Sequence, residues 1–150
     1  MDAASGSEEF IATIVGRYTN KKQAQSDPTG FSWKWIEWIN LGNNTLQSRQ
    51  WDHHTKNVYR ERNFIVENQN SNILLVNHDI NWNSQECDIL WIPTKDGWKS
   101  EGKCHFGKMD IYYTGYLTKK QYRTWDRGFQ NGKQIIGNTQ SEFIFDKQGL

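Results

Sequence analysis

The fold is indicated most clearly by the stretch FSWKWIEWINLGNNTLQSRQW, which occupies residues 31–51. It alternates with a period of two, as at Trp33 and Trp35, and this period is typical of a β-strand. Residues 42–44, Gly-Asn-Asn, then supply the turn chemistry of a hairpin, and a second short β-like run follows. The stretch therefore predicts two strands joined by a tight turn.

Similar short runs continue to the end of the chain, separated by turn residues such as Asp96-Gly97 and Asn131-Gly132. We expect strands at residues 31–40, 45–51, 56–66, 72–80, 86–92, 103–108, 110–117, 121–125, 133–136 and 141–145. Short, evenly spaced strands with hairpin turns are typical of a meander that closes into a barrel or cup.

Two helical segments precede these strands. Ser7 can cap a helix that carries Phe10 and Ile14 on one face. Asn20, followed by Gln23, resembles a capping box at the start of a second, shorter helix.

Length and composition set the domain number and exclude several functions. At 150 residues the chain supports one core, so we assign residues 1–7 to a flexible N-terminus and 8–150 to a single domain. A net charge of +1 argues against a nucleic-acid binder, because such proteins carry a marked basic excess. No apolar run is long enough to span a membrane, and no signal peptide is recognisable, so we expect a soluble, cytoplasmic protein.

The two cysteines, Cys87 and Cys104, are too few for a disulfide framework. Two free thiols are the first expectation in a reducing cytosol. The cysteines flank the hairpin at residues 96–97, however, so the strands can bring them face to face as a candidate disulfide. Such a bridge would add about 3 kcal/mol by the chain-entropy estimate. Neither His53-His54 nor Cys104-His105 has the spacing of a metal motif, so no metal site is expected.

The closing segment carries the most specific motif. Asp-Arg-Gly at residues 126–128 is followed by Asn-Gly-Lys at 131–133, by Gly137, and by Phe-Ile-Phe at 143–145. Upstream lie the run Tyr-Arg-Glu-Arg at 59–62 and the two cysteines. In motifs and spacing, nearly the whole chain resembles the T-type phycobiliprotein lyases.

Some positions depart from the pattern of that family. Ile136 stands where the family has a Trp, and residues 141–142, Ser-Glu, replace a Gly-Pro step. The chain is short, rich in Asn, and has more Lys than Arg, which indicates an AT-rich genome. We therefore hypothesise a compact copy carried by a cyanophage.

The resemblance implies a fold, a ligand and an activity. The fold class is mainly β, an antiparallel calyx-like (lipocalin-like) β-barrel with one or two N-terminal helices. The implied function is binding of an open-chain bilin, phycoerythrobilin or phycocyanobilin, and its thioether attachment to a cysteine of an apo-phycobiliprotein β subunit. Beyond the bilin no cofactor is expected. A homodimer agrees with the family and is the commonest soluble assembly.

The two propionates of a bilin require cations, and its ring N–H groups require an acceptor. Arg60 and Arg62 are two apart, so on a strand they share one face and form our candidate propionate clamp. The alternative is a solvated strand face. Asp126 is the candidate catalytic residue, as an acceptor that holds the rings protonated; a turn-forming role is the alternative. Arg127 either orients Asp126 or reaches a propionate.

Three aromatic residues complete the candidate ligand-binding set. Tyr59 belongs to the motif but alternates with Arg60, so a bulge or strand end is needed for both to face the lumen. Trp33 and Trp35 share one face of the first strand, with Lys34 on the other, and either face can line the cup. Core packing is the ordinary role of most of the 8 tryptophans.

Two other functions stay open. The first is a carrier that binds bilin without ligation activity, which the loss of the Trp at Ile136 favours. The second is a sugar-binding β module that uses exposed tryptophans.

Overall fold

The computed structural model describes residues 3–149, and this part of the chain forms two helices and eleven strands. The helices are α1 (Ala3–Ile14) and α2 (Lys21–Ser26). The strands are β1 (Gly16–Thr19), β2 (Lys34–Gly42), β3 (Thr45–Asp52), β4 (Val58–Gln69), β5 (Asn72–His78), β6 (Ile89–Pro93), β7 (Gly97–Phe106), β8 (Met109–Thr118), β9 (Gln121–Gln130), β10 (Lys133–Ile136) and β11 (Phe143–Lys147). Neither described helix combines the length and apolar character that a membrane crossing requires.

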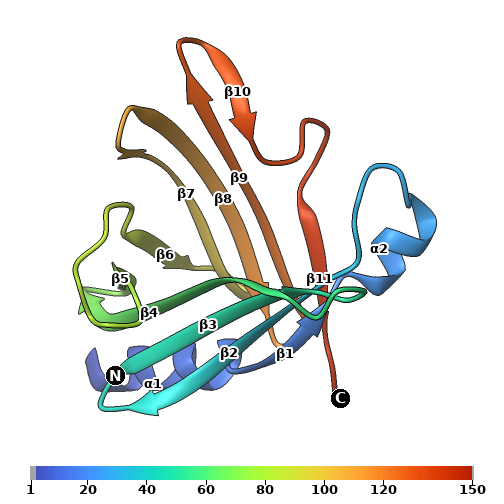
Figure 1. Ribbon diagram of the computed structural model, residues 1–150. Helices are drawn as coiled ribbons and strands as arrows, with labels where there is room; N and C mark the ends of the chain where they lie inside the picture. Colours follow the sequence, from blue (N-terminus) through green and yellow to red (C-terminus); the bar gives the residue numbers. More distant parts are fainter. Residues whose placement is uncertain (1–2, 150) are drawn as a thin grey trace.

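All eleven strands belong to one antiparallel sheet, shown in Figure 1. Its order is β10-β9-β11-β1-β2-β3-β4-β5-β6-β7-β8, and β8 also pairs with β9. This last pairing joins the sheet to itself, so every strand except β10 belongs to a closed ring, and β10 extends from β9. The predicted calyx-like antiparallel β-barrel with N-terminal helices is confirmed.

Helix α1 closes one end of the barrel (Figure 1, blue). It contacts β4, β5 and β8, and its predicted apolar face is buried at Phe10 and Ile14. The Phe10 ring lies 5.3 Å from that of Trp98, edge to face, and 5.9 Å from that of Trp91. Burial of each such side chain contributes about 1.5–3 kcal/mol, so this end holds the hydrophobic core.

The start of α1 differs from the prediction. The helix begins at Ala3, so residues 3–7 are helical, and Ser7 is a buried residue within the helix rather than its cap. Packing of α1 against the barrel extends the helix beyond the local capping signal. The rest of the predicted flexible N-terminus, Met1 and Asp2, lies outside the described residues.

The predicted capping box at Asn20 and Gln23 is also wrong, although α2 starts directly after Asn20. The Asn20 side chain makes no cap; its Oδ1 accepts from the backbone N–H of Lys34 at 2.7 Å. Gln23 donates to the carbonyl of Glu142 at 2.9 Å and accepts from the N–H of Ile144 at 3.0 Å. These amides therefore fasten α2 to the start of β2 and to β11.

Two strand assignments change the topology. Strand β1 was not predicted, because four residues are too few to show a period, yet it joins β11 to β2. Strand β9, predicted to end at residue 125, continues to Gln130 and pairs along its length with β8. Residues 126–128 therefore lie within a strand and not in a turn.

Candidate functional site

A cavity of about 210 Å³ lies inside the barrel, beyond the core that α1 closes. Alternate side chains of the strands line it, and most of its wall is apolar. The apolar or aromatic lining residues are Trp38, Phe64, Ile89, Phe106, Met109, Ile111, Tyr113, Tyr122 and Ile136. The polar ones are Ser48, Gln50, Arg60, Arg62, Asn77, Glu86 and Asp126. A largely apolar cup with a few charged groups is typical of a site for a small molecule.

Arg60 and Arg62 share one face of β4, as their spacing predicted, and both line this cavity. In the described part of the chain neither arginine forms an ion pair, and Arg62 donates one hydrogen bond, to the carbonyl of Glu61 at 2.9 Å. Partial burial, followed by the like charge of Arg60, lowers the pKa of Arg62, and the negative charge of Asp79 partly opposes this change. Arg60 is exposed and Arg62 is half-buried, and two such guanidinium groups without an ion pair in the wall of an apolar cup favour an anionic ligand.

Asp126 lines the same cavity from β9. In the ring order β9 and β4 are five strands apart, so Asp126 and Arg60 lie on facing walls. Burial raises the pKa of the Asp126 carboxyl, and the positive charge of Arg60 partly opposes this rise. No hydrogen bond to the carboxylate forms within residues 3–149. Asp126 is thus an acceptor without a partner, aimed at the lumen, and its predicted turn-forming role is wrong.

Tyr59 lies at the edge of the cavity and does not line it. Gln50 pairs with Arg60 but Trp51 pairs with Val58, so Tyr59 is the extra residue of a β-bulge. The bulge turns its hydroxyl toward Gln50, to which it donates at 3.2 Å. The predicted bulge is therefore present, and it leaves Tyr59 49% exposed at the mouth.

Trp33 and Trp35 lie on the outer face and do not line the cavity. The ring of His53 stacks on Trp33 at 3.4 Å, and Trp35 donates to Nδ1 of His53 at 2.9 Å. Trp35 also stacks on Trp51 across the β2–β3 pair. The opposite face of β2, which begins with Lys34, points inward.

Arg127 likewise points away from the lumen. Its guanidinium lies 4.2 Å above the ring of Trp125, which in turn donates to the carbonyl of Asn138 at 2.8 Å. Since Asp126 faces inward, a period of two places both of its neighbours outside. Neither predicted role of Arg127 fits this position.

Sequence reasoning did not single out Trp38 or Tyr113 as cavity residues. Trp38 follows Lys34 by four positions, so the period of two would have placed it opposite Trp33 and Trp35. Tyr113 pairs with Asp126 across β8 and β9, and only the strand register could have identified it.

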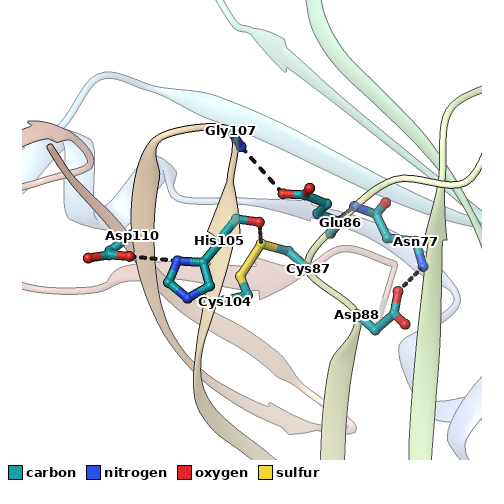
Figure 2. The surroundings of a disulfide bond; sticks show 8 residues. All are labelled: Asn77, Glu86, Cys87, Asp88, Cys104, His105, Gly107 and Asp110. Atoms are coloured by element: carbon teal, nitrogen blue, oxygen red, sulfur yellow. Dashed lines mark hydrogen bonds and ion pairs between the residues drawn. A yellow bond between two sulfur atoms is a disulfide. The ribbon is translucent and has the colours of Figure 1, made fainter.

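Cys87 and Cys104 form a disulfide, shown in Figure 2, which decides between the two expectations for these cysteines. Both cysteines line the cavity. The bond links the segment between β5 and β6 to β7, and a hydrogen bond from the Gly107 N–H to Glu86 at 3.3 Å supports the same link. Within residues 3–149 no three metal-ligating side chains gather into a cluster.

Comparison with known proteins gives structural matches only. No protein-family model and no curated protein sequence matches the chain. The T-type phycobiliprotein lyase CpeT from Prochlorococcus phage P-HM1 has a similar structure, with a TM-score of 0.77 and 21% identity over 95% of this chain and 98% of that one. The CRL protein of Arabidopsis gives a TM-score of 0.75 and 12% identity over 98% and 100%. The chain thus has the fold of a T-type phycobiliprotein lyase, over nearly its full length.

Proposed function

We propose that this protein binds an open-chain bilin in the cavity and promotes its attachment to a cysteine of a phycobiliprotein β subunit. One observation carries the proposal: an unpartnered carboxylate, Asp126, faces two unpaired arginines, Arg60 and Arg62, across a largely apolar cup. The structural likeness to a T-type phycobiliprotein lyase supports the same class of activity.

The chemistry of a bilin matches these groups. Its propionates would pair with the guanidinium groups, and its pyrrole N–H groups would donate to Asp126. A carboxylate near the ring nitrogens stabilises their protonated, cationic form, which makes the ring-A ethylidene more electrophilic. Apolar walls such as Trp38 and Ile111 would contact the faces of the rings.

The size of the cavity suits transfer to a protein. At about 210 Å³ it is smaller than the roughly 300–1,000 Å³ of sites that enclose drug-sized ligands. A tetrapyrrole would therefore keep part of its length at the mouth, where the thiolate of the acceptor protein can add to the ethylidene. Positioning of the pigment in one orientation would supply most of the acceleration.

An absorption titration tests binding, and a ligation assay tests attachment. Phycocyanobilin and phycoerythrobilin should each give a saturable change in visible absorption with the purified protein. With an apo-phycobiliprotein β subunit added, a zinc-fluorescent band at the subunit's mass after denaturation would support ligation. A protein that leaves the pigment spectrum unchanged would contradict bilin binding and favour other ligands, sugars included.

A bilin carrier without ligation activity is the second candidate. The observation that favours it is Ile136, which lines the cavity and is 50% exposed where the lyases have a Trp. A carrier would exchange pigment with the β subunit without forming a covalent adduct. Ile136→Trp separates the two cases, because a gain of ligation in this variant alone would identify the missing ring as the cause.

A further inference from the structure

The disulfide lies in the wall of the proposed binding site. Cys104 of β7 pairs with Ile111 of β8, which pairs with Gly128 of β9. Gly128 lines the cavity on the same face as Asp126, two residues away. With neighbouring strands about 4.8 Å apart, Cys104 lies about 10 Å from Gly128, within the span of one tetrapyrrole.

Cys87 reaches the same wall from the segment between β5 and β6. It is half-buried, as is Cys104, so neither sulfur is sealed in the core. Figure 2 shows the two joined side chains between that segment and β7. Both cysteines line the proposed cavity, so reduction of the disulfide would give two thiols in its wall.

A thiol at this position has a chemical consequence. The ethylidene of a bilin is an electrophile for thiolates, and the proposed Asp126 contact increases this reactivity. A cavity that activates the ethylidene toward a cysteine of the acceptor protein would also activate it toward a free cysteine in the cavity wall. Disulfide sulfur is not a nucleophile toward carbon, because the thiolate is the reactive form.

We infer that Cys87 and Cys104 form a latent attachment site, which the disulfide keeps from capturing the pigment; this inference rests on the proposed bilin site. Reduction of the bond takes up two electrons and two protons from a phosphine or dithiol and yields two thiols. One thiolate then adds to the ethylidene carbon, a C–S bond forms, and the pigment takes up one proton. No group leaves.

The test compares the oxidised and reduced protein with phycocyanobilin. The protein is reduced with a phosphine, which is then removed without oxygen so that no added thiol competes. Absorption reports binding, and zinc fluorescence on a denaturing gel with intact mass reports covalent capture. We expect both forms to bind and the reduced form to capture at least about tenfold more pigment.

Serine variants locate the reacting thiol without any reductant. Cys87→Ser and Cys104→Ser each leave one thiol that has no partner in the chain, and at least one of them should capture the pigment. The double variant should bind and capture nothing. Mesobiliverdin, with an ethyl group in place of the ethylidene, should bind to all forms and stay non-covalent.

The outcomes separate this inference from the proposed function. Binding by the oxidised protein without capture by either the reduced protein or the single variants would overturn the inference alone. The absence of any absorption change with the oxidised protein would overturn the proposed function and the inference with it.

Discussion

The two ends of the barrel are built from the same strands and differ in what those strands carry. Along β4, the buried Phe64 and Val66 lie toward α1, whereas Arg60 and Arg62 lie toward the mouth. The end that α1 closes packs aromatic rings against one another. At the open end, charged groups have no ion-pair partner. Removing such a group from water costs more free energy than removing a paired one.

This difference indicates a division of labour. Unpartnered charges in a partly buried cup lower stability, and the apolar end must compensate for them. Substitutions at the closed end should therefore change the free energy of unfolding. Substitutions at the open end should change ligand binding, and some of them should stabilise the protein.

The largest effect is expected from Phe10→Ala, which removes the ring that α1 inserts against Trp91 and Trp98. A fully buried Phe replaced by Ala costs about 3–5 kcal/mol. Urea unfolding followed by tryptophan fluorescence measures this. Phe106→Ala is the matched control at the mouth, where the ring is 41% exposed. If Phe106→Ala lost as much free energy of unfolding as Phe10→Ala, the proposed difference between the two ends of the barrel would be wrong.

Arg60→Ala should weaken binding of phycocyanobilin by about 10- to 100-fold, because a hydrogen bond to a charged group contributes about 1.5–3 kcal/mol. Stability should change little. An absorption titration gives the affinity. Arg123→Ala is the control, since Arg123 forms an ion pair with Glu142 and does not line the cavity. Equal losses in the two variants would place the ligand elsewhere.

Asp126→Asn should move stability and function in opposite directions. Burial raises the pKa of Asp126 above its ordinary 3.8, so as pH rises past 3.8 the unfolded state loses the proton first. The free energy of unfolding therefore falls as pH rises, and below pH 3.8 the ionisation of Asp126 no longer destabilises the folded state. We expect the variant to be about 1 kcal/mol more stable at pH 7, with the gap growing between pH 4 and 7.

Unfolding curves across this pH range measure the gap. Bound bilin should absorb more weakly and at shorter wavelength in Asp126→Asn, because the protonated form loses its counter-charge. Asp96→Asn, at the exposed turn before β7, is the control and should show neither effect. An Asp126→Asn variant that is less stable than the parent at pH 7 would show that the carboxylate has a partner in the folded protein.

The smallest effect concerns the outer wall. Partial burial, followed by the charge of Lys56, lowers the pKa of His53, whose Nδ1 accepts from Trp35. As pH falls below 6.5 the unfolded state takes up a proton that the folded state resists, so stability falls. His53→Phe should remove this slope between pH 7 and 5 and leave bilin affinity unchanged.

Thermal unfolding at several pH values measures the slope, with His54→Ala as the control. A change in bilin affinity in His53→Phe would mean that the outer aromatic cluster, formed by Trp33, Trp35, Trp51 and His53, contributes to the site after all.

The sequence by itself determined the class of fold and part of the site, because these depend on local patterns. A period of two between turn residues predicted most strands, and the same period placed Arg60 and Arg62 on one face. It also placed Trp33 and Trp35 together. It could not say which of these faces points inward, since that choice depends on how all the strands bury their apolar sides at once.

Tertiary structure alone decided the rest. The pairing of β8 with β9 closes the ring and places Asp126 within a strand, across from Arg60. Asn20 and Gln23 have the spacing of a capping box, yet they bind β2 and β11, which fold against them from more distant parts of the chain. Spacing along the sequence predicts which side chains share one face of a strand or helix. The closure of the barrel determines what that face contacts.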